Sequence, residues 1–211
     1  MVLFGTGKYL ELSDTTGPYR TQSFYSVLDD QAASSGSKNN LTRSNLDTRT
    51  MATTSILGVT YRTVAVGAPA SGTSKGWLVD LPIAGERVVY APQLRAGKVI
   101  FVTLIPSTSP CEAGGTSWLI EVDPITGKPL TDPVFDTNAD GMINTLDVIV
   151  SGRQSTVGIT PAPTFIGGQS SGGNRDNPRK FLSGSSGAIE TVINSDKGSS
   201  GRLSWRELLK E

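Results

Sequence analysis

Histidine is absent from this 211-residue sequence, and cysteine occurs once, as Cys111. Without histidine the chain cannot build a Ser-His-Asp or Cys-His catalytic centre, the common zinc sites or a histidine-based pH switch. A single cysteine excludes a disulfide within the chain and leaves Cys111 as a structural thiol or as the partner of a cysteine elsewhere. The sequence therefore excludes several of the commonest classes of enzyme.

An excess charge and a long apolar run are also missing. The 19 basic side chains equal the 19 acidic ones in number, so no net charge draws the chain toward nucleic acid or an anionic membrane. No apolar run approaches the roughly 18 residues that cross a bilayer. The first residues, "MVLFGTGKYLELSD", lack the basic start and apolar core of a signal peptide. They are typical of a strand that begins within a larger architecture.

Turn-forming residues are abundant, with 24 Gly and 12 Pro, whereas helical periodicity is nearly absent. Short runs rich in β-branched and aromatic residues, bounded by Gly, Pro, Asn, Asp or Ser, predict strands. Such spacing favours an all-β sandwich, barrel or propeller. The polar, glycine-rich segments 32–40 and 167–178 predict loops within this one unit. The expected strands are Val2–Phe4, Ser23–Leu28, Gly58–Val66, Gly76–Leu81, Arg87–Ala91, Lys98–Ile105, Ser117–Val122, Thr156–Thr160, Lys180–Leu182, Ala188–Ile193 and Arg202–Trp205.

The stretch "DTNADGMINTLD", residues 136–147, has the spacing of a calcium loop. Such a loop places side-chain oxygens at positions 1, 3 and 5, glycine at 6, a backbone carbonyl at 7 and a carboxylate at 12. The glycine permits the sharp bend that lets alternate side chains meet at one point. Counted from the first aspartate, the predicted Ca²⁺ ligands are Asp136, Asn138, Asp140, the carbonyl of Met142, Asn144 directly or through water, and Asp147.

The twelfth position carries Asp147 where the usual pattern has glutamate. Its shorter side chain predicts weaker calcium binding, suited to the concentrations outside cells. The alternative is a metal-free turn rich in Asp and Asn, but so many fitting positions favour calcium. We also expect one short helix after the loop, capped by Asn144 or Thr145, with Leu146, Ile149 and Val150 on its apolar face.

Three tryptophans, Trp77, Trp118 and Trp205, lie in expected strands. An aromatic platform for sugar binding is one interpretation. Packing between strands is favoured, because large aromatic side chains supply much of the buried area of β-cores.

Several segments resemble one family in order along nearly the whole chain: "FGTGKYLELSD", "QSFYSVLDD", "KGWLVDLPIAGERVVYAP", "FVTLIPSTSPCEAGGTSWLIEVDPITGKPLTDPVFDTNADG" and "GRLSWRELL". They look like the C-terminal β-propeller of the PilY-type proteins, which are type IV pilus biogenesis factors and tip-associated adhesins of Gram-negative bacteria. The resemblance implies that residues 1–211 form part of a modified propeller with the calcium loop 136–147 inside it. At roughly 40–50 residues per blade the chain supplies about four blades, so we expect a C-terminal fragment of a longer protein.

The family's calcium loop carries over to Asp136, Asn138, Asp140 and Met142. Its ninth position is usually aspartate, whereas this chain has Asn144, which leaves Asp147 as the substitute ligand. The resemblance further implies a non-enzymatic role at the cell surface, after export through the periplasm. There the protein would promote pilus extension and attach the pilus tip to surfaces. The implied partners are minor pilins or the tip complex, together with a host or abiotic surface.

Two other functions remain open from the residues. A propeller enzyme, such as a quinone-dependent dehydrogenase or a glycosidase, needs a cluster of carboxylates or a cofactor cage. The calcium loop already accounts for most of the clustered acidic residues. A calcium-dependent carbohydrate-binding surface module shares the loop and the β-fold, and a measurable glycan affinity would distinguish it.

Overall fold

A computed structural model of the chain describes residues 1–28, 41–109, 114–166 and 178–195. The expected strand Arg202–Trp205, Cys111, segment 32–40 and nearly all of segment 167–178 lie outside the described residues. Two 3-10 helices are described, η1 (Leu12–Thr15) and η2 (Arg43–Asn45). Within these ranges, no helix has the length and apolar character needed to span a bilayer.

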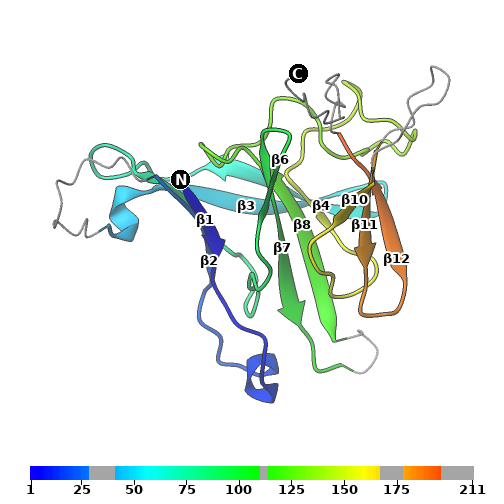
Figure 1. Cartoon of the computed structure of the whole chain (residues 1–211), viewed down its shortest axis with the longest axis horizontal. Helices are drawn as coiled ribbons and strands as arrows, with labels where there is room; N and C mark the ends of the chain where they lie inside the picture. The colour runs from blue at the N-terminus through cyan, green and yellow to red at the C-terminus, as the bar shows by residue number, and fades with distance from the viewer. Residues whose placement is uncertain (29–40, 110–113, 167–177, 196–211) are drawn as a thin grey trace, which may run out of the picture.

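The described strands form two sheets, which confirms the all-β prediction (Figure 1). The larger sheet has the order β1-β2-β5-β3-β4-β9-β8-β7-β6, and only the pairing of β3 with β5 is parallel. The smaller sheet has the order β10-β11-β12 and is antiparallel throughout. The strands are β1 (Val2–Gly5), β2 (Ser23–Val27), β3 (Asp47–Ile56), β4 (Val59–Val66), β5 (Gly76–Asp80), β6 (Gln93–Arg95), β7 (Lys98–Pro106), β8 (Gly115–Val122), β9 (Gly152–Gln154), β10 (Thr164–Ile166), β11 (Arg179–Ser183) and β12 (Ile189–Ile193).

The larger sheet curls into a half-barrel, and one short segment links its two sides. Arg87 exchanges backbone hydrogen bonds with Leu104 of β7, at N···O distances of 2.9 and 2.8 Å. The next N–H, that of Val88, donates to the carbonyl of Thr6 just after β1. The expected strand Arg87–Ala91 is therefore only an isolated bridge, but this bridge connects the ends of the sheet.

Two hydrophobic cores lie on opposite faces of β7 and β8. Because successive side chains of a strand point to opposite faces, Val99 and Phe101 enter the core inside the half-barrel, whereas Ile100 and Val102 enter a second core outside it. That second core also contains Leu182 and Val192 of the smaller sheet. The continuous apolar run of β7 thus follows from its burial on both faces.

Buried ion pairs join distant parts of the chain. Arg62 and Glu86 are fully buried and make two hydrogen bonds, at 2.5 and 2.8 Å. Glu121 of β8 pairs with Lys98 of β7 and with Lys180 of β11. The second cluster ties the smaller sheet to the larger one.

Most expected strands are confirmed within a few residues, and the longest one that was missed has a physical explanation. The strands β3, β6, β9 and β10 were not predicted, whereas segment 156–160 was predicted as a strand and is irregular. β3 reads "DTRTMATTSI" and lacks a clear alternation of apolar and polar residues. It forms because it pairs along its length with β4 across a two-residue turn, so the hairpin partner determines its structure.

Candidate functional site

The acidic loop follows directly from the second core. Phe135 is fully buried and immediately precedes Asp136. Its ring lies near Tyr61 of β4, with a centroid distance of 6.4 Å, and near the ammonium group of Lys180, at 4.8 Å. The hydroxyl of Tyr61 donates to the backbone carbonyl of Asp136 at 3.3 Å. The start of the loop is therefore held by rigid, buried groups.

The side chains at positions 1, 3 and 5 turn back into the loop. The carboxylate of Asp136 accepts the N–H groups of Ala139 and Gly141, at 2.7 and 2.9 Å. The amide oxygen of Asn138 accepts the N–H of Asp140 at 3.0 Å. In turn, Asp140 accepts the N–H of Met142 at 2.8 Å. These bonds require a tight bend, and Ala139 and Gly141 both have positive φ values, 62° and 85°.

Asn144, at position 9, also reaches this group. Its amide nitrogen donates to Asp140 at 3.3 Å, and the amide nitrogen of Asn138 donates to the same oxygen at 3.1 Å. The N–H of Met142, together with these two amides, lowers the pKa of Asp140 below its ordinary value. The four side chains that the spacing predicted at positions 1, 3, 5 and 9 therefore lie in one hydrogen-bonded turn.

Asp147 lies apart from these four side chains, on the buried side of the loop. It is buried, and its oxygens accept the N–H groups of Thr137, Asn138 and Asn144, at 2.7, 3.3 and 2.9 Å. The buried hydroxyl of Thr137 also donates to Asp147 and accepts the N–H of Val148 at 2.8 Å. Asp147 thus closes the two ends of the loop from its buried side. Sequence reasoning missed Thr137, which is buried between the half-buried candidate ligands Asp136 and Asn138.

The helix expected after the loop is wrong. Residues 144–147 make a single turn, with the N–H of Asp147 donating to the carbonyl of Asn144 at 3.2 Å. Side chains take the N–H groups that would extend it: Asn144 accepts from Leu146, and Thr137 accepts from Val148. Short polar side chains compete in this way with helical hydrogen bonds. Leu146 and Ile149 are exposed, and Val150 joins the second core.

The ligand atoms that the loop offers are of the type that binds calcium. It offers carboxylate, amide and carbonyl oxygens, which are the ligands of a hard cation, and no sulfur or imidazole. A carboxylate oxygen that accepts one N–H keeps a second lone pair for a metal. Across the described ranges, no three Asp, Glu, His or Cys side chains make a ready-made metal centre. A cation here would therefore bind the carboxylates of Asp136 and Asp140 together with amide and backbone oxygens.

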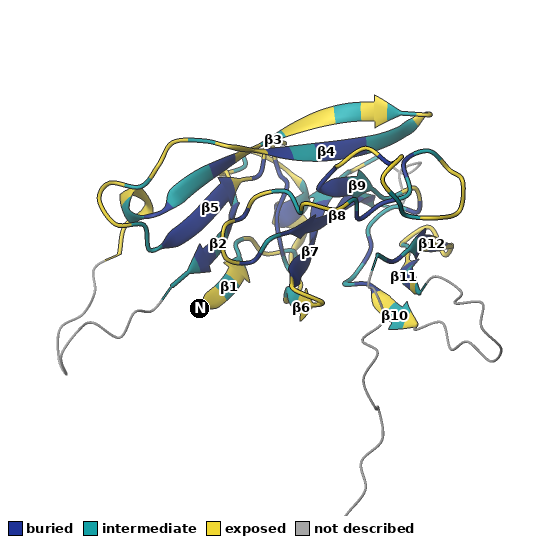
Figure 2. Cartoon of the chain, turned by 90° about the horizontal axis from the view of Figure 1, so that it is seen from above, coloured by how far each residue is buried: buried dark blue, intermediate teal, exposed yellow. Residues whose placement is uncertain are grey.

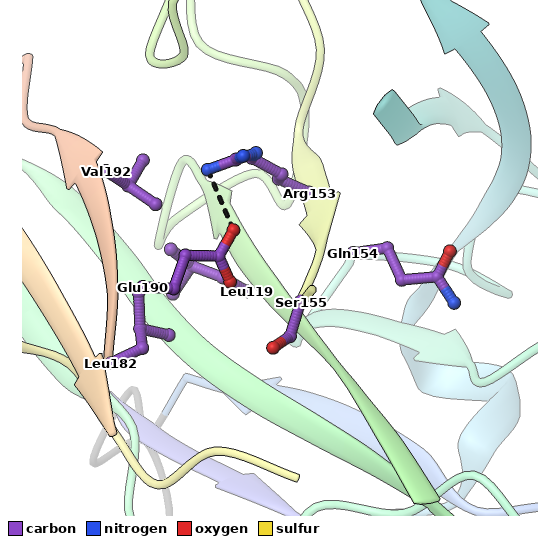
Figure 3. Close-up of a pocket in the computed structure, with 7 residues that line it drawn as sticks. All are labelled: Leu119, Arg153, Gln154, Ser155, Leu182, Glu190 and Val192. Atoms are coloured by element: carbon purple, nitrogen blue, oxygen red, sulfur yellow. Dashed lines mark ion pairs between the residues drawn. The ribbon is translucent and has the colours of Figure 1, made fainter. Parts of the chain in front are cut away.

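A small pocket lies where β8 and β9 meet the smaller sheet (Figure 3). Leu119, Leu182 and Val192 line its apolar side, and Arg153 faces Glu190 across it in an ion pair of 3.1 Å. Its free volume of about 10 Å³ holds roughly one water molecule. This pocket has no room for a sugar or a quinone.

Other candidate residues are explained by packing. Trp77 and Trp118 are each 1% exposed, so they are core residues and no sugar platform. Trp205 lies outside the described residues. Lys180, the first residue of an expected strand, is fully buried against Glu121.

The chain was compared with known proteins. No protein-family model matches it. It is 26% identical, over an alignment of 227 positions that covers 99% of the chain, to the type IV pilus biogenesis factor PilY1 of Pseudomonas aeruginosa strain PAO1. It is 29% identical over 220 positions to a PilY1 homolog of Xylella fastidiosa. The chain spans only 19% and 16% of the lengths of these two relatives.

The fold has a counterpart among solved structures. The crystal structure of the Pseudomonas aeruginosa PilY1 C-terminal domain matches 92% of the chain with a TM-score of 0.68 and 24% identity. The matched part makes up 41% of that domain. The chain is therefore homologous to PilY1 proteins, and its fold matches part of their propeller-like C-terminal domain.

Proposed function

We propose that this PilY1 homologue is a calcium-binding module of a type IV pilus biogenesis factor, and that it acts without catalysis. The observation that carries the proposal is the likeness to PilY1 proteins over 99% of the chain, with the acidic loop inside the matched fold. The names of those relatives place them in pilus biogenesis. Because the chain spans about a fifth of their length, the role of the whole protein is part of the proposal.

The calcium ion would be held by Asp136, Asn138, Asp140 and the carbonyl of Met142, with Asn144 beside them and Asp147 bracing the loop. The metal supplies positive charge that joins carboxylates which otherwise repel one another. The chain's own contribution is positioning. Tyr61 and Phe135 fix the start of the loop, and the contacts of Thr137 with Asp147 fix its end.

The proposed place of action is the cell surface, at the pilus tip, after export through the periplasm. There the module would promote pilus extension and surface attachment through minor pilins or the tip complex. A binding role agrees with the small pocket described above and with the burial of Trp77 and Trp118. Neither this pocket nor these two tryptophans offers a site for the enzyme or the sugar-binding alternative.

Cosedimentation with purified type IV pili of Pseudomonas aeruginosa tests this function. The chain should pellet with pili in millimolar calcium and remain in solution with magnesium or a chelator. Asp140→Ala should lose the calcium-dependent fraction. Asp80→Ala, which removes a partly exposed carboxylate paired with Arg43 elsewhere on the molecule, should retain it. Pelleting that ignores both calcium and Asp140→Ala would contradict the calcium-dependent role, and no pelleting at all would contradict the pilus role.

A further inference from the structure

The strand β3 has one free edge over most of its length. β5 pairs with it only at Asp47–Arg49. From Thr50 to Ile56 it pairs only with β4, and no strand of the described ranges lies on its other side. Figure 2 shows this end of β3 at the margin of the molecule, in the exposed and intermediate colours, with the more buried β4 beside it. Seven residues of edge extend for about 23 Å.

The backbone groups on this edge can be assigned. The hairpin turns at Leu57 and Gly58, both with positive φ, so Ile56 and Val59 form the closing pair. N–H and C=O groups alternate in direction along an antiparallel strand. The carbonyl of Thr48 accepts the N–H of Gly67, on the β4 side, at 2.9 Å. The odd-numbered residues, Met51, Thr53 and Ser55, therefore direct their N–H and C=O groups to the open edge.

Among the described residues, this edge lacks the features that keep edges from pairing. Proteins block exposed edges with charged side chains, proline, bulges or a covering segment. The hairpin sequence "TMATTSILGVTY", residues 50–61, has no charged residue and no proline. The register of β3 with β4 runs without a bulge from Arg49 to Ile56. Such an edge is a template for another strand.

We propose that the free edge of β3 is a self-association site, at which two copies of the chain pair antiparallel about a two-fold axis at Thr53. An uncharged edge of small side chains favours pairing with another uncharged edge of small side chains. The same edge of a second copy of the chain is such a partner. In this register Thr53 faces Thr53 of the other copy, and Met51 faces Ser55. The outward N–H groups of each copy therefore donate to the outward carbonyl groups of the other.

The side chains suit this pairing. Ala52 faces Thr54, threonine pairs are favourable across strands, and no like charges lie opposite one another. An isologous contact of this kind closes on itself and stops at the dimer. The ladder is short compared with the roughly 1,600 Å² of a standard interface, so the dimer is weak and forms where the local concentration is high.

Sedimentation velocity of the 211-residue chain over a concentration series tests the proposal. The native chain should shift from monomer to dimer as its concentration rises. Thr53→Pro removes an outward N–H without removing a β4 bond, since proline is tolerated on an edge in this orientation. It should raise the dimer dissociation constant by about tenfold or more, because ladder bonds are lost at two symmetric positions. Thr53→Val keeps the N–H and a β-branched side chain, and it should dimerise like the native chain.

A second variant distinguishes the loss of the dimer from the loss of the fold. Thr53→Lys keeps the backbone N–H but places two ammonium groups opposite each other across the axis. It should also be monomeric, with a far-UV spectrum like that of the native chain. A native chain that stays monomeric up to millimolar concentration would overturn the proposal. So would a dimer that persists in both Thr53→Lys and Thr53→Pro, because its interface would lie elsewhere.

Discussion

At the scale of single residues, the buried pair of Arg62 and Glu86 is a costly contact to break. Both side chains are fully buried, and the hydroxyl of Thr103 donates to the same carboxylate. The guanidinium group also lies 3.9 Å from the ring centroid of Trp118. This arrangement compensates each charge, so removal of one partner leaves the other charge in the interior.

Arg62→Met should therefore lower the free energy of unfolding by about 3–5 kcal/mol. Urea denaturation at neutral pH measures the change. The matched control is Arg43→Met, because Arg43 pairs with Asp80 where both side chains are about half exposed. Such exposed pairs contribute up to about 1 kcal/mol. Equal losses in the two variants would contradict the buried pair's role.

The lowered pKa of Asp47 predicts part of the pH dependence of the free energy of unfolding. The N–H of Ala70, 2.9 Å away, lowers the pKa of Asp47, and Arg49 lowers it further. A carboxyl group whose pKa is lower in the folded state stabilises the fold above its unfolded pKa, and this contribution is lost as pH falls through the folded value.

Asp47→Asn should therefore cost most near neutral pH, by about 1 kcal/mol, the typical difference between a hydrogen bond to a charged acceptor and one to a neutral acceptor. The difference from the native chain should shrink as pH falls below about 4, where the unfolded carboxyl group becomes protonated. Urea denaturation at several pH values measures it. A difference that stays constant from neutral to acidic pH would contradict this assignment.

At the scale of elements, the turn after β8 closes one end of the first core. The carbonyl of Pro124 accepts hydrogen bonds from the indole N–H of Trp77 and the hydroxyl of Ser26, both at 3.0 Å. Gly127 has a φ of 64°, and a Cβ there would lie 2.3 Å from the Trp77 ring. The turn reads Asp-Pro-Ile-Thr-Gly at residues 123–127, a sequence in which the glycine is suited to a positive φ.

Gly127→Ala should lower the free energy of unfolding by about 2–4 kcal/mol, from the left-handed backbone and the overpacked core together. Gly58→Ala is the matched control. Gly58 has a φ of 80°, but a Cβ there meets nothing within 4 Å. It should cost only about 1–2 kcal/mol. Similar losses on thermal unfolding would show that the contact with Trp77 has no effect.

The elements also show how far the sequence could be read. β7 and β8 were predictable because their apolar runs are buried on both faces. β3 was not, because its polar residues form a strand only beside β4. In the loop, Asp136, Asn138 and Asp140 follow from local spacing. The contacts of Asp147 with Thr137 and Asn144 do not follow from this spacing, because they depend on the turn that replaced the expected helix. Its role as a calcium ligand stays a prediction.

At the scale of the whole molecule, the loop is connected to both sheets. Phe135 and Val134 belong to the second core, which joins the outer face of β7 and β8 to β11 and β12. Lys180 of β11 contacts both the Phe135 ring and Glu121 of β8. A cation bound only by the folded loop would therefore stabilise the molecule as a unit, by about 2.7 kcal/mol at a hundredfold excess over its dissociation constant.

The most direct test of calcium binding is a calorimetric titration of the chelator-treated chain with calcium, with magnesium as the control. One site per chain is expected, with a dissociation constant on the order of 10⁻⁴–10⁻³ M, typical of extracellular modules. The site should disappear in Asp140→Ala and persist in Asp80→Ala. Absence of binding heat together with an unchanged melting temperature at millimolar calcium, or equal binding by Asp140→Ala, would contradict the calcium assignment.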